Sequence, residues 1–188
     1  KYIKENTDCK VIFNGDGSDE VCGGYVYMMN APSAMAFQAE TENLVNQIHL
    51  FDVLRSDRSI SSNGLEARTP FLDKSFVKYY LSIPPHLKTF DITNRIEKYL
   101  LRKSFQNLHL LPEEVLWRNK CAFSDGVSSK QNSWHKVLQN YINTKVSDEE
   151  FISNSKDYSH CTPISKESYF YRKVFESTFE NHENLIPF

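Results

Sequence analysis

The sequence lacks the marks of several protein classes. No apolar run is long enough to span a bilayer, and no secretory signal pattern opens the chain. Its 22 basic and 24 acidic residues give a formal net charge of −2, so no global basic field exists to attract nucleic acid. None of the four cysteines forms a C-x-x-C pair, which argues against a zinc finger or a disulfide scaffold; they are Cys9, Cys22, Cys121 and Cys161.

What is present suits a folded domain or a large part of one. Of the 188 residues, 40% are hydrophobic and 13% are aromatic, enough to furnish a sizeable core. Scattered cysteines favour reduced, buried or half-buried thiols and a cytoplasmic location. Because the chain starts at Lys1 without Met or a signal pattern, we expect further sequence upstream in the natural product.

The pattern predicts mainly helices. The exception is Val11-Ile12-Phe13, a run of β-formers that predicts a buried strand. After it comes a polar turn, residues 14–20, with a helix expected to begin at Ser18 or Asp19. Helical spacing marks residues 41–56, 74–82, 95–106, 133–141 and 165–179, while 57–63 and 148–162 are polar and predict loops.

The turn after this strand carries the densest chemical signal. A Gly-rich turn between strand and helix offers backbone N–H groups to phosphate, whereas Asp16, Asp19 and Glu20 would repel it. A divalent cation resolves the conflict, because Mg²⁺ accepts carboxylates on one side and phosphate oxygens on the other. An ordinary solvated turn explains the same residues, so the bare pattern leaves both interpretations open.

Two other motifs fail at this turn. An EF-hand would need Gly where Asp19 stands and a bidentate Glu where Tyr25 stands. A Walker A loop is excluded because nothing in the chain matches G-x-x-x-x-G-K-[ST].

Five ordered segments resemble one known family, the asparagine synthetases. Residues 14–25 are similar to the family's S-G-E-G-S-D-E-x-x-x-G-Y, and residues 64–73 to its G-x-E-x-R-x-P-F-L-D. Residues 96–102 resemble I-E-K-x-x-L-R, residues 117–126 resemble W-R-x-K-x-x-F-S-D-G, and residues 162–172 resemble T-P-x-x-K-E-x-Y-x-Y-R. The resemblance covers nearly the whole chain and implies the C-terminal portion of one synthetase domain, residues 1–188, of a glutamine-hydrolysing enzyme.

The resemblance implies an α/β fold of the adenine-nucleotide alpha-hydrolase-like (PP-loop ATPase) type, of which this chain would hold mostly the helical C-terminal part with few strands. It also implies a ligase that uses ATP and Mg²⁺ to adenylate the β-carboxylate of aspartate. Ammonia, released from glutamine, then yields asparagine, AMP and pyrophosphate. Implied partners are these small molecules and an N-terminal glutaminase domain, with a homodimer as one assembly and neither nucleic acid nor membrane involved.

Site residues follow from the same resemblance. Asp16, Lys120 and Arg68 take the catalytic positions, and Asp19 and Glu20 take the metal positions. The nucleotide-binding positions are Asn14, Gly15, Gly17 and Ser18. Arg68 could equally form a structural ion pair with Glu66 or Asp73, and Glu97 and Lys98 could be ordinary helix-surface charges.

The chain also departs from the family pattern. Asn14 replaces a serine and Asp16 replaces a glutamate one methylene longer, which predicts retuned chemistry. The glutaminase domain and the S-G-G-x-D-S pyrophosphate loop are absent from these residues, so we expect the 188-residue chain alone to be inactive. Two alternatives remain open: a related carboxylate-adenylating amide synthetase, such as a β-lactam synthetase-like enzyme, or a non-catalytic remnant acting as a binding module.

Overall fold

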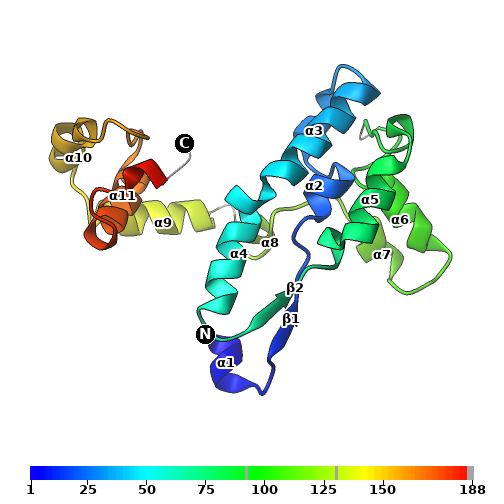
Figure 1. Cartoon of the computed structure of the whole chain (residues 1–188), viewed down its shortest axis with the longest axis horizontal. Coiled ribbons are helices and arrows are strands. Elements are labelled where there is room, and N and C mark those ends of the chain that lie inside the picture. Colours follow the sequence, from blue (N-terminus) through cyan, green and yellow to red (C-terminus); the bar gives the residue numbers. More distant parts are fainter. Residues whose placement is uncertain (92, 130, 186–188) are drawn as a thin grey trace. The chain divides into compact units, whose positions relative to one another are not determined.

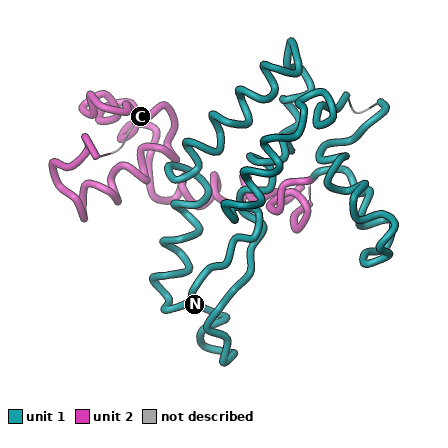
Figure 2. Tube along the Cα trace, turned by 45° about the vertical axis from the view of Figure 1, so that its right-hand side comes forward, with its two compact units in different colours: residues 1–120 teal, residues 121–188 magenta. Residues whose placement is uncertain are grey.

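The computed structural model describes residues 1–91, 93–129 and 131–185. These residues form two compact units, Lys1–Lys120 and Cys121–Phe188, coloured teal and magenta in Figure 2. Each unit has helices and buried side chains of its own, and each is described by itself.

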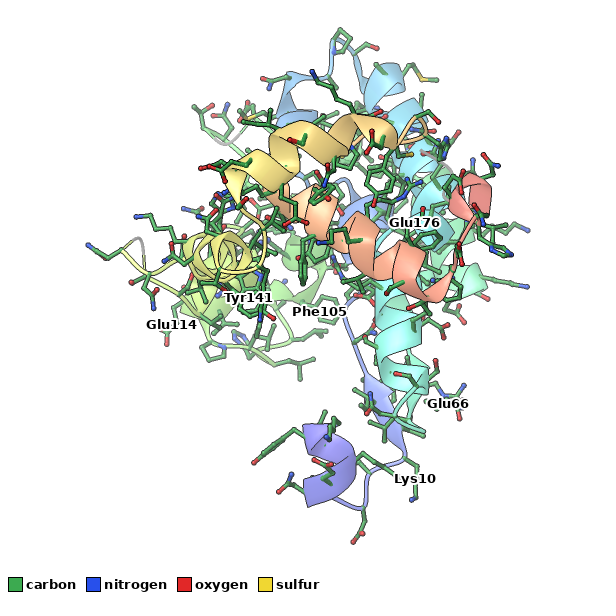
Figure 3. The ribbon with its side chains drawn as sticks, turned by 90° about the vertical axis from the view of Figure 1, so that its left-hand side faces the viewer. Lys10, Glu66, Phe105, Glu114, Tyr141 and Glu176 are labelled. Atoms are coloured by element: carbon green, nitrogen blue, oxygen red, sulfur yellow. The ribbon has the colours of Figure 1, made fainter. Side chains whose placement is uncertain are left out.

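The first unit is built on a two-stranded parallel sheet. Strand β1 (Val11–Phe13) pairs with β2 (Glu66–Arg68), with Val11 opposite Glu66 and Phe13 opposite Arg68. At the amino ends of the strands, the Glu66 N–H donates to the Lys10 carbonyl at 2.8 Å, and Figure 3 labels both residues there. Parallel pairing puts both carboxyl ends at the same edge, so the segments after Phe13 and Arg68 emerge together.

Helices connect and follow the strands (Figure 1). Helix α1 (Tyr2–Asn6) precedes β1. Between the strands lie α2 (Ser18–Cys22), η1 (Val26–Asn30), α3 (Ala34–Gln47), η2 (Ile48–Leu50) and α4 (Asp52–Ser61). After β2 come η3 (Pro70–Leu72), α5 (Lys74–Ser82), η4 (Pro85–Leu87), α6 (Tyr99–Gln106) and α7 (Glu113–Leu116).

The short helix α2 lies in the core of this unit. Val21 and Cys22 are almost fully buried and pack with Tyr80 of α5. A second cluster joins Met28, Phe37 and Phe90. Burying these apolar side chains provides the main favourable free energy of the unit, and it fixes the turn that leads into α2.

The second unit is helical. It contains α8 (Phe123–Gly126), α9 (Trp134–Asn143), α10 (Asp148–Asn154), η5 (Ser155–Asp157), α11 (Lys166–Thr178) and η6 (Glu183–Leu185). Ile142, Val146 and Tyr169 are buried, and Tyr141 of α9 packs edge-to-face on Phe170 of α11. Figure 3 labels Tyr141 on α9 and Glu176 on α11.

Several sequence predictions hold and others need correction. The strand at Val11–Phe13 is confirmed, but its predicted burial is wrong, since Phe13 is 75% exposed. Among the described residues, β2 is the only strand that pairs with β1, so the other edge of β1 is not covered by a strand. The predicted loop at 57–63 is wrong over most of its length, since α4 continues to Ser61. The predicted loop at 148–162 is also wrong over most of its length: Ser147 caps α10 by accepting from the Glu150 N–H, and η5 continues to Asp157.

A mostly helical architecture with few strands is confirmed for the described residues. The finer nucleotide-hydrolase architecture belongs with the proposals below. Across the described ranges, no helix combines the length and apolar character needed to cross a membrane.

Candidate functional site

The turn between β1 and α2 forms one side of the site. Gly17 is the N-cap residue of α2 and has a φ of 85°, a left-handed conformation that favours glycine. A Cβ at this position would lie 2.2 Å from Cδ2 of Leu72, which belongs to η3 after β2. Glycine therefore lets the two segments that leave the sheet edge approach each other closely.

Asp16 is held within this turn by Asn14. The Asn14 Nδ2 donates to the Asp16 Oδ2 at 3.0 Å, and the Asp16 backbone N–H donates to the Asn14 Oδ1 at 3.2 Å. Asn14 is in turn fixed by its backbone N–H, which donates to the Arg68 carbonyl at 3.0 Å. The Asp16 carboxylate is thus tied to the end of the sheet.

Asp19 forms the centre of the site. Its Oδ2 lies 2.7 Å from the Lys120 Nζ, and its Oδ1 lies 2.9 Å from the Lys98 Nζ. The Lys98 Nζ also donates to the Ser18 Oγ at 3.1 Å. Two lysines from distant parts of the sequence therefore converge on the first turn of α2.

The electrostatics of Asp19 reflect both its burial and its lysines. Burial by itself would raise the pKa of the Asp19 carboxyl, but Lys120 and Lys98 outweigh it and lower that pKa. The carboxylate is consequently charged at neutral pH. Each of its two oxygens thus faces one ammonium group, Oδ1 facing Lys98 and Oδ2 facing Lys120.

A buried ion pair places the two lysines. Arg102 Nη2 lies 2.5 Å from the Glu97 Oε1, and its Nη1 donates to the Leu116 carbonyl at 2.6 Å. Arg102 thereby ties the start of α6, where Lys98 is the N-cap residue, to the end of α7, which Lys120 follows four residues later in the sequence. Lys98 itself has a φ of 57°, uncommon for a residue other than glycine.

Glu20 takes different partners from Asp19. It is 6% exposed and accepts a hydrogen bond from the Tyr25 hydroxyl, whose oxygen lies 3.4 Å from the Asp52 Oδ2. Burial, followed by the hydrogen bond to Glu20, raises the pKa of Tyr25, so the phenol stays neutral. The Lys120 Nζ lies 5.3 Å from the centroid of the Tyr25 ring, within cation–π range.

Arg68 ends β2 at the same edge as the turn. Its Nη2 pairs with the Glu66 Oε1 at 2.7 Å, and both side chains are more than half exposed. This is the ion pair that the sequence left as an alternative to ligand contact. An exposed pair of this kind is weak, so it leaves the guanidinium available to other anions.

The structure brings most of the predicted site residues together and adds two. Asn14, Gly15, Asp16, Gly17 and Ser18 form one turn, next to Asp19 and Lys120. Lys98 and Tyr25 were not predicted as site residues, although both lie in the family-like segments. The sequence offered no sign that Lys98 turns inward, because its neighbours suit an ordinary exposed helix start.

The donor set suits magnesium held jointly with phosphates. Among residues 1–91, 93–129 and 131–185, no group of three or more His, Cys, Asp or Glu side chains gathers as a metal site. Mg²⁺ at phosphate-transfer sites is usually held by one or two carboxylates together with the phosphates. Asp19 and Glu20, in the first turn of α2, are two carboxylates of this kind; Asp19 is paired with Lys98 and Lys120, and Glu20 accepts from Tyr25.

The comparisons with known proteins agree on one family. A family model described as asparagine synthase matches residues 30–185. The chain is 51% identical over 186 residues to the glutamine-hydrolysing asparagine synthetase of Mus musculus, covering 99% of this chain and 33% of that protein. The corresponding proteins of Bos taurus and Homo sapiens are 46% and 49% identical, again with 33% of their length covered. The chain thus spans about a third of these relatives.

Proposed function

The chain belongs to the asparagine synthase family, and from this premise we propose that the protein carrying it makes asparagine from aspartate. An oxygen of the aspartate β-carboxylate attacks the α-phosphorus of ATP, and pyrophosphate leaves. The nitrogen of ammonia then attacks the resulting acyl carbon, AMP leaves with the bonding electron pair, and a base removes a proton from the nitrogen.

The observation that carries this proposal is the convergence of Lys98 and Lys120 on Asp19, beside the turn that holds Asp16. Departure of pyrophosphate needs fixed positive charge near the phosphates, which these ammonium groups supply. Proton removal from ammonia needs a positioned base, the role proposed for Asp16. Arg68 orients an anionic group of the substrate at the same edge.

The nucleotide and its metal have proposed contacts in the same turn. The backbone of Asn14 together with Gly15, Gly17 and Ser18 lines the nucleotide, and Asp19 with Glu20 would hold Mg²⁺. A bound Mg²⁺ would supply Lewis-acid neutralisation of phosphate charge. The fold around this turn is proposed to be a PP-loop nucleotide-binding sheet, whose ligands lie at the carboxyl ends of the strands.

Parts of the relatives beyond this chain supply the rest of the proposal. The relatives are named as glutamine-hydrolysing enzymes, so ammonia is proposed to come from glutamine at a glutaminase domain of the same protein. We further propose that the enzyme is cytoplasmic and forms a homodimer. Light scattering on the complete product would check the dimer.

The test is aspartate-dependent exchange of labelled pyrophosphate into ATP by the complete natural product. Lys120→Met and Asp19→Asn should each lower the exchange at least about a hundredfold. The first removes positive charge next to the leaving group, and the second removes the carboxylate that holds both lysines in place. Lys103→Met is the matched control and should leave exchange unchanged, since Lys103 is exposed on α6 and its Nζ donates to the neighbouring Gln106 Oε1 at 2.7 Å.

Two other results of the exchange assay would contradict the proposal. Exchange that requires a different carboxylic acid would overturn the aspartate assignment in favour of a related amide synthetase. A folded complete product without exchange for any acid tested would support a binding module instead.

A further inference from the structure

Both the nitrogen and the oxygen of the Asn14 side-chain amide form hydrogen bonds. Its Nδ2 lies 3.0 Å from the Asp16 Oδ2 and 3.0 Å from the Ser56 Oγ. Its Oδ1 accepts from the Asp16 backbone N–H at 3.2 Å. An amide nitrogen carries two protons, so both donors of Asn14 have protein partners.

These partners connect Asp16 to two separate elements. The Asn14 backbone N–H is bonded to the Arg68 carbonyl at the end of β2, and Ser56 lies in the middle of α4. Asn14 therefore fixes a carboxylate on an irregular turn to the sheet and to a helix. Turn residues otherwise have more freedom than residues of regular elements, so such a brace restricts where the carboxylate can lie.

The two side chains match each other in length. The motif that residues 14–20 resemble has serine and glutamate where this chain has Asn14 and Asp16. The amide nitrogen of asparagine lies one bond farther from the backbone than a serine hydroxyl, and the carboxylate of aspartate lies one bond nearer than that of glutamate. The combined reach of the pair is the same in both versions.

We infer that Asn14 is a positioning residue that holds the Asp16 carboxylate in its working place, with Ser56 as its anchor. The inference rests on the proposed function, in which Asp16 accepts the proton from ammonia. It assigns the Asn14 side chain to Asp16, in place of the nucleotide contact that the family resemblance implies.

The experiment measures ammonia-dependent asparagine formation by the complete natural product, with kcat and the KM for ATP determined separately. Asn14→Ser should lower kcat about tenfold, the loss expected when one hydrogen bond to a charged group disappears, while the KM for ATP changes less than about threefold. Asp16→Glu should lower kcat similarly. The double variant Asn14→Ser/Asp16→Glu should recover to within about threefold of the natural enzyme, because the combined reach is restored.

Two variants on α4 complete the design. Ser56→Ala removes the anchor and should lower kcat about threefold in the same direction. Ser61→Ala, an exposed serine at the end of the same helix, is the matched control and should change nothing. Circular dichroism of each variant establishes that it is folded.

The outcomes separate the inference from the function. Effects of Asn14→Ser and Asp16→Glu that simply multiply in the double variant overturn the inference, as does a raised KM for ATP with unchanged kcat. A folded natural enzyme that forms no asparagine contradicts the proposed function, and the inference falls with it.

Discussion

At the scale of single residues, Tyr25 joins the two charged parts of the site. Its hydroxyl donates to the buried Glu20, and its ring lies beneath the Lys120 ammonium group. One side chain thus has two separable functions, a hydrogen bond that stabilises a buried carboxylate and a π face that holds a lysine.

Changing Tyr25 should separate these functions. Tyr25→Phe keeps the ring and should leave pyrophosphate exchange within about threefold, but it should lower the free energy of unfolding by about 1–3 kcal/mol because Glu20 loses its donor. Tyr25→Leu should in addition lower exchange about tenfold through the lost cation–π contact. Urea denaturation and the exchange assay measure the two effects, with Tyr27→Phe as control for an exposed hydroxyl that bonds Glu40. Equal exchange in both Tyr25 variants would contradict the role of the ring.

The Asp19 carboxyl should make stability depend on pH in a defined direction. Its pKa is lower in the folded protein than the usual value near 4, so its contribution to stability is complete above that value and is lost as the pH falls through the folded pKa. The natural protein should exceed Asp19→Asn in free energy of unfolding at about pH 7, and the difference should shrink by about pH 3. Urea denaturation at several pH values measures it; a difference that does not change with pH would show that charge on Asp19 is not the cause.

Residue-level prediction from the sequence succeeded where a motif has a fixed local order. The turn from Asn14 to Ser18 is contiguous in the chain, so its members could be grouped before the structure was considered. Lys98 could not be recognised in the same way, because its contact with Asp19 depends on how α6 is anchored by Glu97 and Arg102. Which predicted residues bind ligand stays a prediction.

At the scale of secondary-structure elements, glycine decides how closely η3 can approach the start of α2. Gly17→Ala places a methyl group against Leu72 at a left-handed φ, so it should lower the free energy of unfolding by about 1–3 kcal/mol. Gly15→Ala is the matched control for stability, because a Cβ there meets nothing within 4 Å. Thermal and urea unfolding of both variants measure the effect. Equal stability of the two would mean that the η3 segment moves away without cost.

Two helix starts follow from the residue types at their caps, whereas other helix bounds differ from the prediction: α4 runs to Ser61 and α6 begins at Tyr99. Asp73 and Ser165 cap α5 and α11, as their residue types predict, with Asp73 accepting from the Ser75 and Phe76 N–H groups at 2.9 and 3.1 Å. Strand β2 was not predicted, since Glu66-Ala67-Arg68 lacks β-branched and aromatic residues and becomes a strand through its pairing with β1.

At the scale of the whole molecule, the chain consists of two units with separate buried clusters. Ile142→Ala should therefore destabilise residues 121–188 by about 2–5 kcal/mol, because Ile142 is 1% exposed and its loss leaves a cavity. Native-state hydrogen exchange should show faster exchange in α9, α10 and α11, and unchanged protection in α2 and α5. Faster exchange throughout both units would instead mean that they unfold as one.

The lysine pair around Asp19 has a further consequence for how an anion enters. Asp19 acts as an internal counter-ion that keeps two ammonium groups close together. In the proposed function, an arriving phosphate would exchange with a carboxylate, and the lysines would not first have to assemble or lose a full shell of water. The site would thereby be preorganised for an anion, with the organisational cost of binding met during folding.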